Sequence, residues 1–362
     1  MNNPIAEINL SNLFQNCKYI KSIIGDSKLF PVIKADAYGH GAKNIAQFLN
    51  NKEIIDGFCV ATEFEADELL ECQILKPIFI LGKINFTKSR LLSKKNIIST
   101  IHSLDDLYEV KKLNENNQKM NLQIKFDTGM GRLGIGLDEL DKVIHEIKKS
   151  EINIIGCWSH FSSANEDNQE YTNLQLNRFN YVLRKFFQKN IKLKYIHIAN
   201  SSAILQNSKS YFNVVRPGIS VYGISPLEKL NENLLPVMKF KLPLIKKIYK
   251  TSGESIGYNR IYQTQNNEIL GILQGGYADG VSTIFNNNGF VKIKDKLSPI
   301  RGKISMDLTA VDISNSDIEI GQYVTVWGEK ELTLENLSKK YGKIPYEFLV
   351  NLSNRVEKKY YD

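Results

Sequence analysis

The sequence lacks any long hydrophobic run, and it contains only four cysteines. No stretch approaches the roughly 18 consecutive apolar residues of a membrane span, and residues 1–10 lack the apolar run of a secretory signal. The cysteines include no Cys-x-x-Cys pair, so neither a zinc knuckle nor a disulfide framework is indicated. They are scattered at Cys17, Cys59, Cys72 and Cys157. We therefore expect a cytoplasmic protein with reduced thiols, no metal site and no membrane partner.

Arginine is scarce in this basic chain, because only eight of the 47 Lys and Arg residues are arginines. The net charge of +8 is spread over many separate lysines rather than concentrated in one basic block. This distribution favours a solvated basic surface over a nucleic-acid site, so we expect no nucleic-acid partner. Since arginines are few, those near a glycine motif are more informative than any lysine, and Arg132 and Arg216 are of this kind.

Short apolar runs alternate with amphipathic segments between Phe30 and Gly223, which is typical of buried parallel strands joined by helices. The expected strands are Phe30–Lys34, Gly57–Ala61, Pro77–Leu81, Ile98–His102, Leu122–Phe126, Ile152–Ser159, Tyr195–Ile198 and Val214–Tyr222. The expected helices include Glu63–Glu71, Leu104–Leu113, Leu137–Lys149 and Gln169–Gln188. Eight alternating units predict an α/β fold with a (β/α)8 TIM-like barrel. A doubly wound sheet would also alternate, but no Gly-x-Gly-x-x-Gly follows the first expected strand.

The pattern changes after Leu235 to strands separated by turn residues, with only Leu334–Tyr341 helical in its spacing. Asn288-Gly289 between Thr283–Phe285 and Phe290–Ile293 predicts a hairpin, because both turn residues tolerate positive φ. We therefore expect a barrel over residues 1–234 and a C-terminal, mainly β domain over residues 235–362.

Reactive side chains follow several of the expected barrel strands. In a β/α barrel the carboxyl ends of the strands share one mouth, where active sites form. The residues at these ends include Lys34, Lys125, Arg132, His160, Asn200, Ser201 and Arg216. We expect them to converge on that mouth.

Two of these features together favour pyridoxal phosphate as a cofactor. Ser201 and Gly218–Ile219 follow the last two expected strands, where such barrels bind phosphate, although an N-cap serine and a turn glycine would look the same. Lys34 ends an apolar run, and a poorly hydrated lysine amine can form a Schiff base. An ordinary snorkelling or paired lysine is the alternative for Lys34 taken alone.

The segment Val32-Ile-Lys-Ala-Asp-Ala-Tyr-Gly-His-Gly41 resembles the cofactor-lysine signature of the alanine racemase family. Further segments resemble that family's motifs in the same order, and they extend through both expected domains. They are Ala6–Leu10, Lys125–Gly134, Ser159–Phe161, Ala199–Ser201, Val215–Ile219, Gly276–Gly280 and Ser305–Asp307. The resemblance implies a two-base, pyridoxal-phosphate-dependent interconversion of L- and D-alanine that supplies D-alanine for peptidoglycan.

The resemblance also implies roles for individual residues. Lys34 would carry the cofactor and act on the D-face, and Tyr277, from the β domain of the partner subunit in a homodimer, would act on the L-face. Two acid/base groups on opposite sides suit a reaction that removes a proton from one face and returns one to the other. The further cofactor-binding residues would be Tyr38, His160, Asn200, Ser201, Arg216, Gly218 and Ile219. Arg132 and Met306 would bind the substrate carboxylate, and Lys125 is a candidate for carbamylation.

Arg216 would face the pyridine nitrogen of the cofactor, where a cation discourages ring protonation and weakens the ring as an electron sink. Tyr277 is a poor base at neutral pH unless its surroundings favour the phenolate, and the resemblance assigns that task to His160 and Arg216. Without its Gly-Tyr-Ala-Asp-Gly setting, Tyr277 would be taken as a core or interface tyrosine. A structural ion-pair role is the alternative for Arg216.

Two positions depart from the family pattern. Arg355-Val-Glu-Lys358 stands where Arg-Val-Pro-Arg is frequent, and Asn354 stands where some members have a tyrosine. A smaller residue at the entrance leaves open an alternative, a broader racemase that also accepts serine or lysine. A second alternative, a non-catalytic pyridoxal-phosphate carrier, is disfavoured because such carriers lack the β domain.

Overall fold

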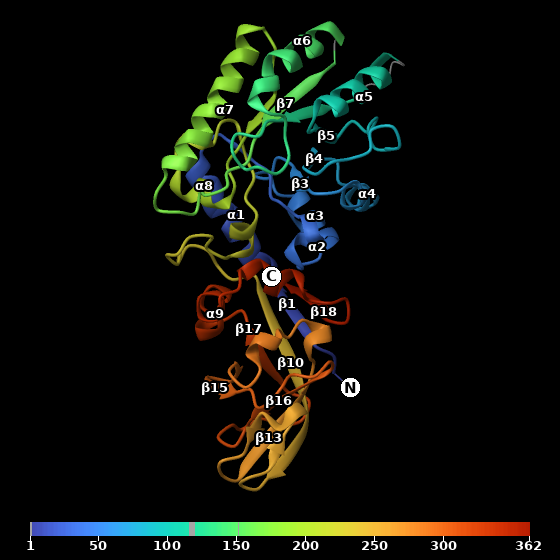
Figure 1. The fold of residues 1–362 in the computed structure, drawn as a ribbon. Coiled ribbons are helices and arrows are strands. Elements are labelled where there is room, and N and C mark those ends of the chain that lie inside the picture. The colour runs from blue at the N-terminus through green and yellow to red at the C-terminus, as the bar shows by residue number, and fades with distance from the viewer. Residues whose placement is uncertain (1, 116–119, 151) are drawn as a thin grey trace. The chain divides into compact units, whose positions relative to one another are not determined.

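A computed structural model describes residues 2–115, 120–150 and 152–362 of the chain (Figure 1). The chain divides into two compact units. The barrel unit comprises Phe14–Val221 and Ser225–Leu234, and the β unit comprises Leu235–Asp362, Tyr222–Ile224 and the segment that ends at Leu13. No helix in the described ranges combines the length and the apolar character needed to cross a membrane.

Eight short parallel strands form the barrel unit. Six of them make one sheet in chain order: β3 (Phe58–Val60), β4 (Ile78–Ile80), β5 (Ile97–Ile101), β6 (Leu122–Lys125), β7 (Ile154–Trp158) and β8 (Tyr195–His197). The other two, β2 (Lys28–Leu29) and β9 (Val214–Val215), pair with each other in parallel.

Backbone hydrogen bonds beyond these strands close the ring. Cys59 N–H donates to Pro31 O at 3.0 Å and Ile33 N–H donates to Cys59 O at 2.9 Å, which joins the chain after β2 to β3. Arg216 N–H donates to Ala199 O at 3.0 Å, which joins the chain after β9 to the chain after β8. The predicted (β/α)8 barrel is therefore confirmed.

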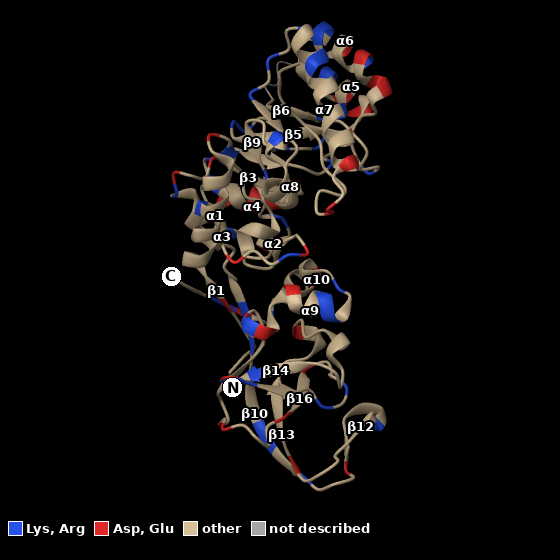
Figure 2. Ribbon diagram, turned by 90° about the vertical axis from the view of Figure 1, so that its left-hand side faces the viewer, with Lys and Arg blue, Asp and Glu red and all other residues tan. Residues whose placement is uncertain are grey.

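Helices cover the outside of the barrel, and their bounds follow the apolar spacing of the sequence closely. The helix predicted at Glu63–Glu71 is α4, which begins after a capping box formed by Thr62 and Glu65. The other helices are α1 (Leu10–Ile24), α3 (Ala42–Asn50), α5 (Leu104–Glu115), α6 (Leu140–Ser150), α7 (Glu170–Gln188) and α8 (Ser201–Gln206). Basic and acidic residues are mixed on α5 and α6 (Figure 2), and Lys111 pairs with Glu146 at 3.3 Å.

Stacked rings fill the inside of the barrel. Phe30 stacks on Phe79 with 4.4 Å between ring centroids, and Phe79 stacks on His197 at 5.0 Å. His197 in turn stacks on Trp158 at 5.6 Å. The imidazole of His197 also meets the Gln123 side chain at 2.9 Å, so this buried histidine has a polar partner within the core.

The β unit is built on an eight-stranded sheet with a short separate hairpin. Its strands are β1 (Ile5–Asn9), β10 (Met238–Lys250), β13 (Glu268–Gln274), β14 (Phe290–Ile293), β15 (Lys296–Pro299), β16 (Leu308–Asp312), β17 (Tyr323–Trp327) and β18 (Glu357–Tyr361). The hairpin pairs β11 (Ser255–Ile256) with β12 (Tyr262–Gln263), and the helices are α9 (Leu334–Tyr341) and α10 (Pro345–Val350). The mainly β character expected after Leu235 is therefore confirmed.

The first strand of the chain pairs within the β unit. Residues of β1 pair antiparallel with β10, as Ile5 does with Lys241, and parallel with β18. This arrangement differs from the expected division into 1–234 and 235–362, which assigns β1 to the barrel. Pairing between positions so far apart leaves no local trace in the sequence.

Two expected strands differ from the prediction: Phe30–Lys34 follows β2, which ends at Leu29, and Val214–Tyr222 is longer than β9. The chain of Phe30–Lys34 bridges to Cys59 only at Val32, and Lys34 already begins α2 (Lys34–Tyr38). Only Val214–Val215 of Val214–Tyr222 is a strand, and Ile219–Tyr222 is a 3-10 helix. Pro217 lies between them, and a proline has no N–H to donate to a strand ladder.

The predicted hairpin at Asn288-Gly289 is wrong. Thr283–Phe285 is a 3-10 helix, and β14 instead turns at Lys294, with φ 53°, to pair with β15. Gly289 serves a different purpose, because a Cβ there would lie 2.5 Å from the Phe285 Cβ atom. The glycine thus marks a close approach of two segments rather than a positive φ. The helix α10 also lay outside the expected pattern.

Candidate active site

Lys34 begins a turn of unusual backbone conformation at the end of the β2 segment. The next four residues, Ala35 to Tyr38, all have φ between 50° and 54° although none is a glycine. Left-handed conformation costs an L-residue roughly 1–2 kcal/mol, so neighbouring groups must hold this turn in place. Lys34 itself is accessible to solvent. Its pKa lies below the ordinary value of a lysine, first because protein displaces water around the amine and next because Arg132 is close.

Cationic groups gather around His160, which follows β7. Loss of hydration is the largest cause that holds the pKa of His160 well below its ordinary value. Nearby positive charges add to it, in the order Arg216, Lys125, Arg132 and Lys34. His160 is therefore a neutral imidazole at neutral pH, and these four cations are close enough to influence it.

Arg216 is buried at the centre of this group, with 3% of its surface exposed. Its Nη2 donates to Ser159 O at 2.8 Å and to Ile198 O at 3.3 Å, and its guanidinium lies 4.8 Å from the centroid of the Trp158 ring. Burial lowers its pKa to about 10, so it stays charged at neutral pH. Its Nε has no hydrogen-bond partner among the residues that the structure describes, which leaves one donor available to a ligand.

Lys125 ends β6 and is even more enclosed, with 2% of its surface exposed. Its Nζ lies 4.8 Å from the centroid of the Trp158 ring, so the two cations Lys125 and Arg216 share this indole. Burial, followed by the charges of Arg132 and Arg216, lowers the pKa of Lys125 to about 8. A substantial neutral fraction is therefore present near physiological pH, and the neutral amine is the form that can react with carbon dioxide.

A compact group of hydroxyls lies where the sequence predicted phosphate binding. Ser201 Oγ accepts hydrogen bonds from Gly218 N–H at 2.8 Å and from Ser220 Oγ at 3.0 Å. A Cβ on Gly218 would lie 2.5 Å from the hydroxyl oxygen of Tyr38, so the absence of a side chain at Gly218 lets this hydroxyl lie against its backbone. Ile219 follows directly and is buried.

Asn200 has a clear structural role beside this group. Its side-chain oxygen accepts a hydrogen bond from Ala203 N–H at 3.0 Å and caps the N-terminus of α8. Ser201 is the first residue of that helix, so the cap places its hydroxyl against Gly218. Asn200 therefore orients the hydroxyl group of its neighbour.

The β unit carries the two other predicted site residues on adjoining loops. Tyr277 N–H donates to Ser305 O at 3.1 Å and Ala278 N–H donates to Met306 O at 3.1 Å. A Cβ on Gly276 would lie 2.2 Å from Ser305 O, so this glycine is required for the contact. The structure thus brings together two motifs that lie far apart in the sequence. Tyr277 and Met306 remain 48% and 53% exposed.

Arg355 was noticed in the sequence only as part of a departure from the family pattern, but it links both loops. Its Nε lies 3.1 Å from Asp279 Oδ1, and its Nη2 donates to Asp307 Oδ1 at 2.8 Å. Asp279 is 1% exposed, and its other oxygen accepts Gly276 N–H at 2.9 Å. One arginine therefore fixes the residues that flank Tyr277 and Met306. The arginine scarcity of the chain was the only available signal for it.

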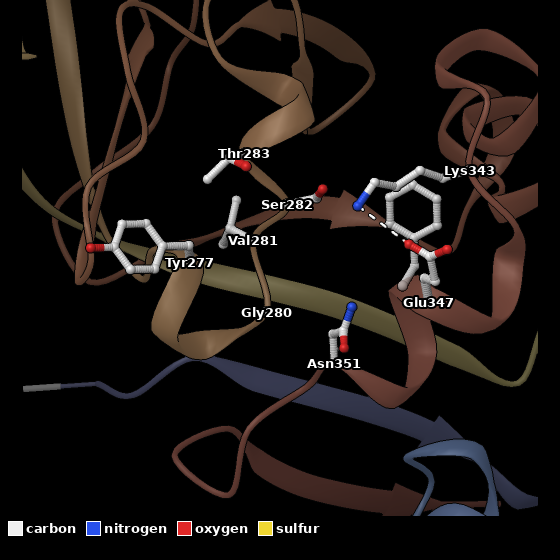
Figure 3. A pocket seen from close by; sticks show the side chains of 9 residues that line it. Tyr277, Gly280, Val281, Ser282, Thr283, Lys343, Glu347 and Asn351 are labelled. Atoms are coloured by element: carbon white, nitrogen blue, oxygen red, sulfur yellow. Dashed lines mark ion pairs between the residues drawn. The ribbon is translucent and has the colours of Figure 1, made fainter.

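A cavity of about 290 Å³ adjoins Tyr277 within the β unit (Figure 3). Lys343 and Glu347 form an ion pair at 3.3 Å on its far side, and Asn351 lies below that pair in the view. The ring of Tyr277 points away from the pair. These lining residues were not anticipated from the sequence, because they belong to the region around α10.

Comparisons with known proteins cover the chain from end to end. The model of the alanine racemase N-terminal domain matches residues 8–226, and that of the alanine racemase C-terminal domain matches residues 237–360. An alanine racemase of Clostridium novyi is 37% identical, with 98% of this chain and 94% of that protein covered.

Solved structures agree with this similarity. Alanine racemase from D-cycloserine-producing Streptomyces lavendulae has a TM-score of 0.93 at 27% identity, with 100% of this chain and 98% of that chain covered. The enzyme from Bartonella henselae, described with covalently bound pyridoxal phosphate, has a TM-score of 0.91 at 28% identity and full coverage of both chains. The matches extend over both units and all the motifs singled out above, and the chain belongs to the alanine racemase family.

Proposed function

We propose that this protein is a pyridoxal-phosphate-dependent alanine racemase in which Lys34 carries the cofactor and the partner subunit's Tyr277 supplies the second acid/base group. The activity is the interconversion of L- and D-alanine, and the family membership favours alanine over the broader alternative with serine or lysine. The observation that carries the residue assignment is the gathering, in one barrel, of Lys34 with its lowered pKa and the hydroxyl group around Ser201.

The barrel residues fit the cofactor chemically. The hydroxyls of Tyr38 and Ser201, together with the close-packed Gly218–Ile219 backbone, are suited to a phosphate group. The buried Nε of Arg216, which lacks a protein partner among the described residues, is suited to an acceptor atom such as a pyridine nitrogen. Bound pyridoxal phosphate would supply an aldehyde for the lysine amine and an electron-withdrawing ring that acidifies the α-proton of the amino acid.

The protein residues then move protons and orient the substrate. Lys34, with its lowered pKa, exchanges a proton with the α-carbon on the D-face, and Tyr277 does so on the L-face. The neutral His160 beside Arg216 can accept a hydrogen bond from the phenol, and the nearby positive charge favours the phenolate. Arg132 and Met306 orient the substrate carboxylate, and carbamylated Lys125 would give Arg132 an anionic partner.

A head-to-tail homodimer would bring the β unit of one subunit to the barrel of the other. The exposure of Tyr277 and Met306 supports this assembly, because catalytic residues on an isolated surface need a second surface to exclude water. We further propose that the protein acts in the cytoplasm and supplies D-alanine for peptidoglycan.

The proposal is tested by two linked measurements on the protein with bound cofactor. Borohydride reduction followed by peptide mass spectrometry should place the cofactor on Lys34. NMR in deuterated water should then show α-proton exchange with inversion for both enantiomers of alanine, and little for serine or lysine. Cofactor on another lysine, or exchange without inversion, would contradict the proposed pair of bases.

A further inference from the structure

Glu65, on the first turn of α4, is the acceptor for three backbone N–H groups from two segments. Its Oε1 accepts Ala35 N–H at 2.7 Å, directly after Lys34. Its Oε2 accepts Ala61 N–H at 2.7 Å and Thr62 N–H at 3.0 Å, at the end of the β3 segment. The carboxylate therefore joins the Lys34 turn to the neighbouring barrel strand.

The turn needs such a tether because of its backbone conformation. Ala35, Asp36, Ala37 and Tyr38 are consecutive left-handed residues that would relax if left unsupported. Internal bonds close the far end of the turn, where Gly41 N–H donates to Asp36 O at 2.9 Å and Asp36 Oδ1 accepts Ala42 N–H at 2.7 Å. At the Lys34 end, Ala37 N–H donates to Ile33 O at 2.9 Å, and Glu65 adds a side-chain contact from outside the turn, directly after Lys34.

We propose that Glu65 is a positioning residue that holds the left-handed turn bearing Lys34 and Tyr38 in its cofactor-binding conformation. The proposal rests on the assignment of Lys34 as the residue that carries the cofactor. The negative charge of Glu65 also counteracts the effect of Arg132 and Arg216 on Lys34, since it favours the protonated amine. Glu65 thus influences the chemistry of Lys34 through its neighbour's backbone, without itself touching the reacting atoms.

A capping function for α4 is the competing explanation, and the structure offers a matched control for it. Glu65 and Thr62 form a reciprocal capping box, in which Glu65 N–H donates to Thr62 Oγ1 at 3.2 Å. Thr62→Ala removes half of the box but leaves the carboxylate of Glu65 and its bond to Ala35. Glu65→Ala removes both the cap and the tether, so the difference between these variants reports the tether.

The test measures the dissociation constant of pyridoxal phosphate by titration of cofactor-free protein. Glu65→Ala should weaken cofactor binding by about ten-fold or more, whereas Thr62→Ala should change it by less than about two-fold. Glu65→Gln, which keeps one amide oxygen as an acceptor, should lie between them. Equal binding by Glu65→Ala and Thr62→Ala, both folded by circular dichroism, would overturn the proposal.

A second-site substitution keeps the test independent of general destabilisation. Ala35 is exposed, and glycine adopts its positive φ without strain. Ala35→Gly should therefore restore most of the cofactor affinity lost in Glu65→Ala, and an unchanged affinity would count against the tether. Mass spectrometry of reduced wild-type protein separates the two failures: cofactor bound elsewhere than Lys34 refutes the proposed site, whereas cofactor on Lys34 with no effect of Glu65 refutes only this inference.

Discussion

The two units differ in how they hold the proposed site residues: the barrel unit buries some of them and leaves Lys34 exposed, whereas both residues of the β unit are half exposed. In the barrel unit, Lys125 and Arg216 are buried with their pKa values lowered, and they share the Trp158 ring. In the β unit, Tyr277 and Met306 are half exposed, and their backbones are pinned by hydrogen bonds and by Arg355. Burial lowers the pKa values of Lys125 and Arg216, whereas hydrogen-bonded loops fix the backbone positions of Tyr277 and Met306. Under the proposed function, the buried cations belong to the cofactor site of the barrel, and the β unit presents Tyr277 and Met306 to a partner subunit.

The largest effect is expected in the barrel unit. Lys34→Ala should lower racemisation in both directions by more than about 10⁴-fold, because in the proposed mechanism this one side chain binds the cofactor and moves a proton. Chiral chromatography of the products measures the loss. Lys43→Ala is the control, since Lys43 pairs with Glu68 at 3.4 Å and lies on the surface. Substantial activity without Lys34 would show that the barrel site is not the reaction centre.

A substitution in the β unit should affect the two enantiomers of alanine differently. Tyr277→Phe removes only the hydroxyl and should slow α-proton exchange of L-alanine by about 10²–10⁴-fold, whereas exchange of D-alanine, which uses Lys34, should persist. NMR in deuterated water with each enantiomer separates the two. Equal loss for both enantiomers, or none for either, would remove the distinction between the faces.

The burial of Lys125 should make stability depend on pH. The folded protein loses this proton near pH 8 and the unfolded chain near 10.5, so the unfolded state binds more protons between those values and stability rises with pH there. In the wild-type protein the free energy of unfolding should rise by about 3 kcal/mol across that pH range, and Lys125→Met should abolish this rise. Denaturant titrations at pH 7.5 and 10.5 in carbon dioxide-free buffer measure it. The same rise in the free energy of unfolding in the wild-type protein and in Lys125→Met would mean that burial does not lower the pKa of Lys125.

The pinning of the β unit loops is tested at Arg355. Arg355→Ala leaves the buried Asp279 carboxylate with fewer partners, and it should lower the stability of the protein and slow the exchange of L-alanine several-fold. Lys294→Ala, which breaks an exposed pair with Asp317 of 2.9 Å in the same unit, is the control. If both variants behave alike, Arg355 is an ordinary surface cation.

The smallest effect is expected at the departure from the family pattern. Asn354 is exposed in the structure. Asn354→Tyr should therefore change the free energy of unfolding by about 0.5 kcal/mol or less, as exposed substitutions usually do, and we expect alanine turnover to stay within about two-fold. Steady-state kinetics with alanine and serine measure this. A large gain in discrimination against serine would show that the asparagine widens the entrance.

Much of the fold followed from local patterns, and the exceptions share a cause. The helices at Glu63–Glu71 and Leu334–Tyr341 match α4 and α9 because apolar spacing and capping residues act within one or two turns. The strand pairing of Ile5 with Lys241 could not be predicted, because it depends on residues far apart in the chain. The left-handed turn after Lys34 runs against the preferences of its own residues, so only the surrounding contacts explain it.

The candidate site also combines features that the sequence could predict with features that it could not. The cations that lower the pKa of His160 all belong to motifs singled out in the sequence, because they lie at or after the carboxyl ends of parallel strands. The links made by Glu65 and Arg355 could not be seen, since each joins segments remote in sequence through one ordinary charged side chain. A charged residue carries no sign in the sequence of which backbone group it will contact.

The central claim, that each site takes Lys34 from one subunit and Tyr277 from the other, is tested most directly by mixing two inactive variants. Lys34→Ala and Tyr277→Phe subunits, exchanged at equal concentration, should form mixed dimers with one intact site each. With random pairing the mixture should recover about one quarter of the wild-type activity. If native mass spectrometry shows mixed dimers but racemisation stays at the level of the separate variants, Lys34 of one subunit does not act together with Tyr277 of the other.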